Sequence, residues 1–394
     1  MAASDALKAL SQAAAEAEQW LFESAAPLWA TVGFRSDGMF AEQIGLDGKA
    51  LALPGRLRVQ ARQIYAFCEL GRLGWTGNWR NCAERAVGHL LERGRRSDGL
   101  FIHTFSAEGA PLDARADLYD HAFVLFSLGH AARALNRDDL LAVARSTADK
   151  LMAWRHPEGG FREGEVDGPP RRQNPHMHLL EAALALWQAS SDVFWKDLAS
   201  EIATLCRDRF IDSGTGALRE YFTEDWRPVP GADGDLVEPG HCFEWAWLFE
   251  RLDACGIADG AAAKGGLVSF ARHYGLDAGR GVAINAVSVN GAVASADARL
   301  WPQTERMKAA LARFRRTGAE CEAQEAVAGF RGLRKYFDTP VKGLWRDVLK
   351  SAGRFVEQPA PASSFYHIVC GLAELIDTGG PFRSRPCGPC DDAW

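Results

Sequence analysis

The sequence contains no apolar run that approaches the roughly 18 residues needed to span a membrane. Its first ten residues, MAASDALKAL, also lack the positively charged stretch and the apolar core that make up a secretory signal. We therefore expect no membrane partner and no export, and we expect the protein to be cytoplasmic.

The sequence also lacks a strong charge bias. It has 45 Lys and Arg residues against 51 Asp and Glu residues, which gives a formal net charge of −6. No basic stripe stands out, and such a stripe is the usual mark of a surface that binds nucleic acid or lipid headgroups. We therefore expect no nucleic-acid partner. No linker-like tract of Pro, Ser and Gly divides the chain, which favours a single domain over residues 1–380.

The nine cysteines are an odd number, scattered through apparent helices. This usage is typical of reduced cytosolic thiols rather than of a disulfide framework. The one motif among them is CGPC at residues 387–390, in a segment rich in Pro and Gly. A structural zinc site needs four ligands, and no second cysteine pair or HxxxH completes this one. We interpret the motif as an incidental pair in a flexible tail, residues 381–394, and we expect no metal.

Apolar residues recur at spacings of three and four in about twelve segments, which is the pattern of amphipathic helices. Alternation typical of strands is confined to short pieces such as VAINAVSV, which argues against a large sheet. The helical segments follow one another in six successive pairs. They cover approximately residues 8–30, 56–74, 78–94, 116–135, 138–155, 175–190, 193–210, 240–254, 259–273, 302–316, 319–337 and 362–377.

These pairs coincide with an internal repeat of roughly 60 residues. Six times, a glycine-led extended piece runs through a polar loop into a helix, as in GLFIHTFSAEGAPLDARADLYDHAFVL. Six units, each with one inner and one outer helix, predict an all-α (α/α)6 barrel with short hairpin-like loops at one mouth. An open helical solenoid has the same periodicity. The helix after each loop opens with a conspicuous polar side chain: Arg62, His121, His178, His241, Gln303 and His367.

The position of these side chains near helix N-termini has chemical consequences. The helix dipole disfavours a second positive charge at that end, so an imidazole there is expected to be neutral and able to accept a proton near pH 7. Glu244, one turn after His241, is expected to fix the tautomer of that ring. One such histidine is ordinarily a core residue, whereas four at matching places favour a shared cavity. The positions at which these helices begin are inferred from Asn174 as an N-cap and from Pro175, Pro239 and Pro302, which fit the first turn of a helix.

The chain resembles the N-acylglucosamine 2-epimerase superfamily, which includes mannose isomerase, sulfoquinovose isomerase and cellobiose 2-epimerase. The resemblance is carried by QARQIYAF, LYDHAF, NPHMHLLEA, EPGHCFEWAWL, RLWPQTE and SSFYHIVCGLAEL, in order, between about residues 30 and 377. It implies an (α/α)6 barrel, and chemistry at C1 and C2 of a sugar without metal or cofactor. It also implies that His241 and His367 are the catalytic pair, that Arg62 binds substrate and that His178 is a third active-site histidine. Asn174, Trp301 and Gln303 match pocket-lining positions.

The residues themselves fit that chemistry. Moving a carbonyl between C1 and C2 needs a base for the carbon-bound proton and donors for the enediolate oxygens. His241 and His367 are candidates for the proton steps, including ring opening, while Arg62 and His178 can stabilise the oxygens. Trp301 offers a face on which a sugar can stack. His121 is open to either reading, pocket-lining or structural.

Two observations favour an aldose–ketose isomerase of a neutral monosaccharide, D-mannose and D-fructose. The segments NPHMHLLEA and SSFYHIV resemble the mannose isomerase branch most, and the loop before His241 is acidic, which disfavours an anionic sugar. That loop contains Asp233, Asp235 and Glu238 and has no arginine after Arg227.

Other functions stay open on the sequence. A 2-epimerase would use the same two histidines, so the residues do not separate it from an isomerase. An inverting glycoside hydrolase of the same fold would need an acid and a base carboxylate, with Glu244 and Glu181 as the candidates. A helical-repeat surface that binds another protein, and a homo-oligomer, are also compatible with the sequence. His176 and His178, two residues apart, point to different helix faces and are poorly spaced for one metal.

Overall fold

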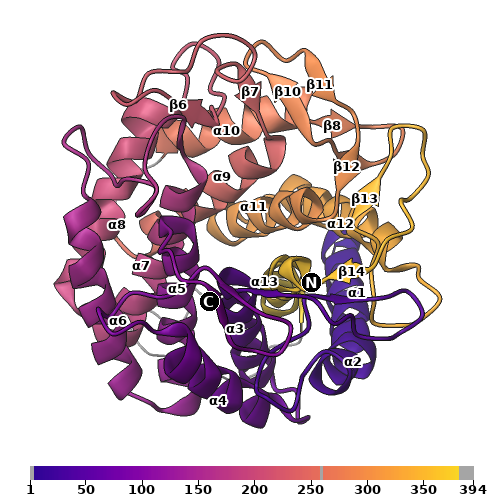
Figure 1. The fold of residues 1–394 in the computed structure, drawn as a ribbon. Coiled ribbons are helices and arrows are strands. Elements are labelled where there is room, and N and C mark those ends of the chain that lie inside the picture. The colour runs from indigo at the N-terminus through magenta and orange to yellow at the C-terminus, as the bar shows by residue number, and fades with distance from the viewer. Residues whose placement is uncertain (1–3, 258–260, 381–394) are drawn as a thin grey trace.

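The computed structural model describes residues 4–257 and 261–380 of the chain. In that part the helices form a closed double ring, as Figure 1 shows. Each inner helix packs against the next, and the last of them packs against the first. The predicted (α/α)6 barrel is therefore confirmed, and the open solenoid is excluded. The inner helices are α3 (Leu57–Leu73), α5 (Leu118–Leu135), α7 (Asn174–Ser190), α9 (Pro239–Ala254), α11 (Trp301–Thr317) and α13 (Ser363–Gly379).

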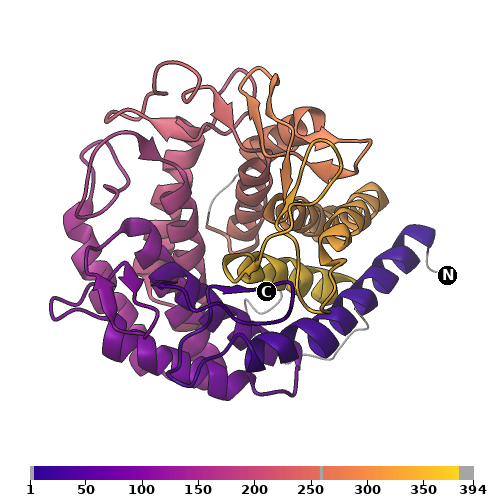
Figure 2. The same ribbon diagram turned by 45° about the vertical axis from the view of Figure 1, so that its right-hand side comes forward.

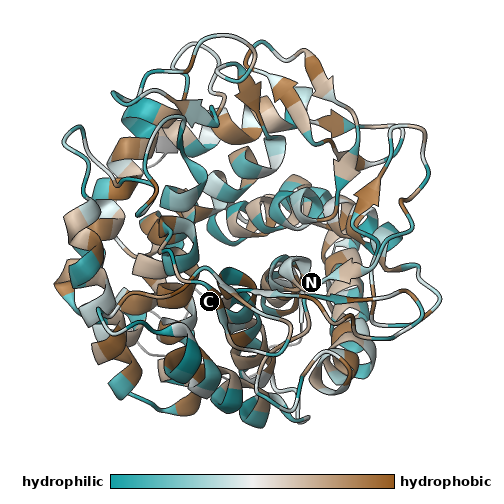
Figure 3. Ribbon diagram, viewed as in Figure 1, coloured by the Kyte–Doolittle hydropathy of each residue, from teal (hydrophilic) through white to brown (hydrophobic). Residues whose placement is uncertain are grey.

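The outer ring covers the inner one with amphipathic helices. On α4, for example, the buried residues recur one helical turn apart, as a one-sided apolar stripe requires. Figure 3 shows hydrophilic and hydrophobic residues interleaved along these helices. The outer helices are α1 (Asp5–Trp20) with α2 (Ala26–Thr31), α4 (Trp79–His89), α6 (Asp139–Leu151), α8 (Val193–Leu205), α10 (Ala261–Tyr274) and α12 (Glu320–Arg334). Single π-helical turns occupy Leu21–Ala25, Leu90–Gly94 and Cys206–Phe210, and 3-10 turns occupy Met152–Trp154 and Lys335–Phe337.

The first helical rod of the chain closes the ring against the last helix. Helix α1 packs along α13, as the turned view in Figure 2 shows. Trp29 in α2 is fully buried and stacks on Trp345 and on Phe365 of α13, with ring centroids 5.0 and 5.5 Å apart. Residues about 330 positions apart therefore form one apolar contact. Helices α1 and α2 occupy the position of the outer helix in the sixth repeat.

Short strands form a second closed ring at the mouth. The sequence predicts hairpins within repeats, but most strands pair between successive repeats: β2 with β3, β5 with β6, β7 with β10, β12 with β13, and β14 back to β1. A single bridge between Asp117 and Gly164 links the second and third repeats. The strands are β1 (Gln43–Ile44), β2 (Gly55–Arg56), β3 (Thr104–Phe105), β4 (Pro111–Asp113), β5 (Arg171–Arg172), β6 (Tyr221–Phe222), β7 (Leu236–Val237), β8 (Leu276–Asp277), β9 (Val282–Ala283), β10 (Ala286–Ser288), β11 (Val293–Ser295), β12 (Ala298–Arg299), β13 (Val348–Leu349) and β14 (Ala360–Pro361).

The glycines that lead each repeat are required by backbone geometry. Gly38 and Gly99 have φ values of 91° and 92°, in the left-handed region that other residues rarely adopt. These turns direct each chain segment into its mouth loop and place the following inner helix with its N-terminus at that mouth. The CGPC motif and the expected tail, 381–394, lie outside the described residues. No helix in the described ranges is long and apolar enough to cross a membrane.

Candidate active site

His241, in the first turn of α9, is held by a carboxylate from the mouth segment before it. Its Nδ1 lies 2.9 and 3.0 Å from the two carboxylate oxygens of Glu220. Burial opposes the charged imidazole, but Glu220 and Glu238 outweigh burial and raise the pKa of His241 to about 10. The ring is therefore an imidazolium at neutral pH. The sequence-based expectation of a neutral imidazole is wrong, because two nearby carboxylates act more strongly than a helix dipole.

The other nitrogen of His241 lies beside Asn174, the first residue of α7. Asn174 Nδ2 is 3.2 Å from His241 Nε2, while Asn174 Oδ1 has no hydrogen-bond partner. Because an imidazolium is a donor at both nitrogens, the amide turned over about its terminal bond would accept from Nε2–H through that oxygen. Gln173, rather than Asn174, occupies the N-cap position of α7. The asparagine therefore contacts a histidine instead of capping a helix.

His367, in the second turn of α13, also has a carboxylate partner but the opposite charge state. Its Nδ1 lies 2.9 Å from Glu305 Oε1, and the second oxygen of Glu305 lies 2.7 Å from the ammonium of Lys308. Burial lowers the pKa of His367 to about 3; Glu305 acts against this, whereas Arg62 and Lys308 reinforce it. His367 is therefore a neutral imidazole with the proton on Nδ1, which leaves Nε2 as a proton acceptor.

His178, in the second turn of α7, is the third histidine of the cluster. Its Nδ1 lies 3.2 Å from Glu181 Oε2, which also accepts the hydroxyl hydrogen of Tyr366 at 2.5 Å. Burial lowers the pKa of His178 to about 4, so this ring is neutral as well. Glu181 thus joins α7 to α13 across the interior of the barrel.

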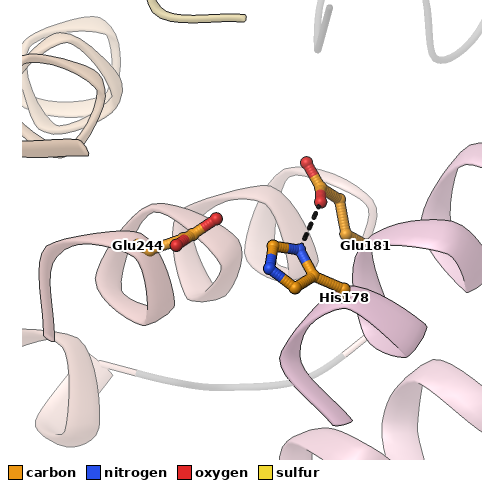
Figure 4. Close-up of side chains that lie close together, drawn as sticks. All are labelled: His178, Glu181 and Glu244. Carbon is orange, nitrogen blue, oxygen red and sulfur yellow. Dashed lines mark hydrogen bonds and ion pairs between the residues drawn. The ribbon is translucent and has the colours of Figure 1, made fainter. Parts of the chain in front are cut away.

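Glu244 of α9 faces the cluster and has no hydrogen-bond partner on either oxygen. In Figure 4 its carboxyl group and the ring of His178 point toward each other from α9 and α7. Burial and the charge of Glu305 raise the pKa of Glu244 well above its usual range, so the group is a neutral carboxylic acid. The expectation that Glu244 fixes the tautomer of His241 is wrong, since the imidazolium is protonated on both nitrogens and its Nδ1 donates to Glu220.

Arg62 and Trp301 complete the side chains that reach solvent at this mouth. Arg62 donates to the hydroxyl of Tyr119 at 2.8 Å and lies 4.0 Å from the ring centroid of Phe123, but its Nε has no partner. The Trp301 ring lies close to both catalytic candidates: its centroid is 4.8 Å from that of His241 and 5.7 Å from that of His367.

Residual exposure and one glycine support a site at this position. Arg62 and His241 are each 6% exposed, and Trp301 and His367 are each 7% exposed, although most neighbours on the same helices are sealed at 0–2%. Solvent therefore reaches these four side chains. A Cβ on Gly240 would lie 2.5 Å from the Trp301 ring, so the first turn of α9 needs glycine for the tryptophan to occupy its place.

His121 and Gln303 lie outside this cluster because each ties a mouth loop to an inner helix. His121 Nε2 accepts the backbone N–H of Phe101 at 2.9 Å, and its Nδ1 donates to a backbone carbonyl at 2.7 Å. The Gln303 amide bonds both backbone groups of Ala283, at 2.7 and 2.8 Å. Both side chains are sealed from solvent. The expectation that Gln303 lines the pocket is therefore wrong, and of the two readings of His121 the structural one holds.

The same hydrogen bond between an inner helix and a mouth loop, called a tie below, recurs in the first and third repeats. It shows that the sequence-based alignment of polar residues between repeats was offset by two positions at His121 and Gln303. Gln60 bonds both backbone groups of Phe40, and His176 accepts the backbone N–H of Phe161 at 2.9 Å. The residue that enters the site follows two positions after each tie. The tie and site residues are Gln60 and Arg62, His176 and His178, and Gln303 and Glu305.

Sequence reasoning missed Glu220, Glu305 and Lys308. Glu305 belongs to the RLWPQTE segment, and aligning the repeats on the tie residues places it level with Arg62 and His178. Glu220 lies in a mouth segment, and Lys308 lies one turn below Glu305, so neither carries a motif of its own.

Three groups in the described chain have donor atoms close enough for a metal ion. One is Glu220, Glu238 and His241, where an imidazolium has no lone pair to offer a metal. The other two share Glu244. Ligand atoms of Glu244, Glu305 and His367 lie within 4.8 Å of one another, as do those of His178, Glu181 and Glu244. The ammonium of Lys308 already lies 2.7 Å from Glu305, and it would repel a cation placed beside it. The donor set is therefore a poor fit for a resident metal.

The closed double ring is the fold of the (α/α)6-barrel enzymes. Relatives named as mannose isomerases and cellobiose 2-epimerases place the chain among the isomerases and epimerases of that fold. Residues 38–371 match the profile of the N-acylglucosamine 2-epimerase (GlcNAc 2-epimerase) family, and the chain belongs to that family.

Individual relatives cover nearly the whole chain. A mannose-6-phosphate isomerase of Rhizobium meliloti (strain 1021) is 42% identical over 376 residues, which are 92% of this chain and 97% of the relative. A D-mannose isomerase of Thermobifida fusca is 28% identical over 332 residues, 77% and 80% of the two chains. A solved structure of a D-mannose isomerase superposes with a TM-score of 0.84 at 20% identity, over 96% of this chain and 100% of the other. The last of these comparisons shows the fold alone.

Replacing Gln303 by alanine is expected to reduce stability more than chemistry. The change leaves the buried N–H and C=O of Ala283 without partners, at about 1–3 kcal/mol for each group. We expect Gln303→Ala to lower the free energy of unfolding by about 2–4 kcal/mol, and kcat/KM of the folded fraction to stay within about threefold. Urea denaturation and a sugar-isomerisation assay measure the two quantities. Gln12→Ala, on the exposed face of α1, is the control. A stable but inactive Gln303→Ala protein would contradict this assignment and would show that Gln303 lines the pocket.

Proposed function

We propose that the protein interconverts an aldose and its ketose, D-mannose and D-fructose, through a cis-enediol(ate) intermediate and without a metal. The observation that carries the proposal is the contrast between the charge states of the two histidines that pack near Trp301. His241 is an imidazolium and His367 is a neutral imidazole. Two titratable groups whose surroundings push their pKa values apart are suited to act as acid and base.

The proton inventory of the reaction balances with these two groups. His367 Nε2 takes the proton from C2 of the open-chain aldose and returns it to C1. His241 donates a proton to O1 as the enediolate forms, and then takes one from the O2 hydroxyl as the ketose carbonyl appears. The same pair serves ring opening, which needs a proton delivered to the ring oxygen and one removed from the anomeric hydroxyl.

The remaining residues bind and orient the sugar in this proposal. Arg62 has an unpartnered Nε, so the guanidinium retains a donor for substrate oxygens. Glu244, as a neutral acid without a partner, is a donor to a hydroxyl or to the developing oxyanion. His178 and Asn174 extend the polar wall, and Trp301 provides the stacking face.

The names of the relatives support a mannose–fructose reaction, but they do not decide whether the substrate is the free sugar or its 6-phosphate. The 42% identical relative is named for mannose 6-phosphate, and the 28% identical relative for D-mannose. The geometry favours the neutral sugar, because three arginines near the mouth besides Arg62 are already paired with carboxylates, and a phosphate would have to displace those carboxylates. These pairs are Arg58 with Asp120 at 3.0 Å, Arg172 with Glu163 at 2.6 Å and Arg299 with Asp347 at 3.7 Å. The phosphorylated sugar is the second candidate substrate.

The hydrolase alternative fits the geometry less well. It needs two carboxyl groups that are free to act on a glycosidic bond and a water. Glu181 is occupied by His178 and Tyr366, and the titratable rings that pack near Trp301 are those of His241 and His367.

Turnover of free sugars tests the proposed function. We expect fructose as the first product from D-mannose, full activity after chelation, and mannose 6-phosphate as the poorer substrate in kcat/KM. Chromatography of the products resolves the sugars, and reaction in deuterated water reports exchange at C1 and C2. Glucose as the first product from mannose would identify a 2-epimerase. A preference for the phosphorylated sugar would reverse the substrate assignment, and loss of activity on chelation, restored by zinc, would falsify the metal-free scheme.

Two glutamine variants separate the ionised glutamate from the neutral one. Glutamine is isosteric with a protonated carboxyl group, so Glu244→Gln keeps a donor and should lower kcat by no more than about tenfold. Glu305→Gln removes the anion that fixes the proton of His367, and should lower kcat by about a hundredfold or more. Steady-state kinetics on both variants, with folding checked by circular dichroism, measures the difference. Equal losses would contradict the assigned charge states.

A further inference from the structure

Lys308 is a charged side chain sealed inside the barrel, beneath the site. It lies in the middle of α11 with no exposed surface, and its Nζ is 2.7 Å from Glu305 Oε2 and 3.7 Å from the ring centroid of Trp247. Lysine is almost never fully buried unless it is paired, because removing the ammonium from water is costly. Packing alone would be served as well by methionine or leucine at this position.

The carboxylate of Glu305 bridges this lysine and the catalytic candidate on α13. One oxygen faces Lys308 and the other accepts from His367 Nδ1 at 2.9 Å. The hydroxyl of Thr304 donates to the same oxygen as His367, at 3.1 Å. The lysine is thus linked to the base through the carboxylate of Glu305.

Three buried carboxyl groups compete for ionisation in this cluster. Glu181, Glu244 and Glu305 all lie near Lys308, and a second or third negative charge in a low-dielectric interior is strongly disfavoured. Burial opposes ionisation of Glu305, but Lys308 and then His367 hold its pKa at about 2, whereas Glu244 stays protonated. The other groups that face this cluster are Arg62 on α3 and Tyr366 and Cys370 on α13.

We propose that Lys308 is a positioning residue for the isomerisation: by keeping Glu305 ionised, it holds the proton of His367 on Nδ1 and leaves Nε2 as the acceptor. The proposal rests on the proposed function in so far as His367 is the base. A protonated Glu305 would donate its hydrogen to Nδ1 and force the histidine proton onto Nε2, where the carbon-bound proton has to be received. The charge of Lys308 therefore selects which tautomer the site presents.

The direction in which the pKa values change when this charge is removed can be predicted. Lys308 lowers the pKa of both Glu305 and His367. In Lys308→Met both pKa values rise, so the acidic limb of the activity profile moves to higher pH. Because the pKa of Glu305 starts at about 2, we expect the acidic limb to move up by about four pH units when the buried cation is lost. The loss in kcat should then be about tenfold at pH 5 and small at pH 7, with a KM within about threefold of wild type.

A double-mutant cycle with Glu305→Gln separates positioning from packing. If Lys308 acts through Glu305, then Lys308→Met/Glu305→Gln should match Glu305→Gln in kcat within about threefold. The double variant removes the ammonium and its ion-pair partner together, so it keeps the test valid even where Lys308→Met alone does not fold. Independent losses that multiply in the double variant would overturn the proposal, as would a Lys308→Met enzyme with an unshifted pH profile.

The tautomer itself gives a readout that needs no substrate. Nitrogen-15 spectra of histidine-labelled protein distinguish a proton on Nδ1 from one on Nε2, and His367→Ala identifies the signal. At pH 5 we expect the Nδ1–H form in wild type and the Nε2–H form in Lys308→Met. Retention of the Nδ1–H form in a folded Lys308→Met protein would overturn the inference even if mannose turnover is established. Conversely, failure of wild type to convert any sugar would overturn the proposed function and leave the tautomer result standing.

Discussion

The hydrogen bond between an imidazole Nδ1 and a buried carboxylate is the interaction on which this site depends. It occurs at His241 with Glu220 and at His367 with Glu305, at 2.9 Å in each case. The same bond produces opposite charge states because the surroundings differ. Glu238 adds a second negative charge near His241, whereas Lys308 neutralises Glu305, and Arg62 lies near His367. The acid and the base of the proposed reaction are thus distinguished by their neighbours and not by residue type.

The barrel is the device that brings these neighbours together. The inner helices start at one mouth, so first- and second-turn side chains from five of them converge, and a ring of short strand pairs supplies residues such as Glu220 from the loops. Most of the ring is sealed by apolar packing. Several buried polar atoms without partners in the described chain gather at the site: both oxygens of Glu244, Arg62 Nε and Asn174 Oδ1. Such unsatisfied groups reduce stability, and they are retained where a ligand can satisfy them.

The fold could be predicted from the sequence because the spacing of the helical segments reveals the length of the repeat. Repeats of roughly 60 residues, glycine-led turns and apolar spacing each depend on local pattern, and each was confirmed. The pairing of strands between repeats was not predictable, because two-residue strands carry almost no periodicity of their own. The helix expected at 8–30 is interrupted by a π-helical turn at Leu21–Ala25, which no local signal marks.

The site was predictable in part, and the errors have two causes. Conspicuous polar residues were aligned between repeats, but His121 and Gln303 belong to the loop ties, two positions before the residues that enter the cluster. Charge states were inferred from the helix dipole alone, because carboxylates brought in from other repeats cannot be placed without the fold. Glu220 and Lys308 decide the chemistry of His241 and Glu305 while leaving no motif in the sequence.

A pH titration of the histidine nitrogen-15 signals tests the central claim most directly. The account predicts that His241 stays an imidazolium and that His367 stays neutral from about pH 5 to pH 8, since their pKa values lie near 10 and near 3. The variants His241→Ala and His367→Ala assign the two signals. Two rings that titrate together near their ordinary pKa would contradict the account, because the carboxylates and the lysine would then not be setting opposite charges at the two positions.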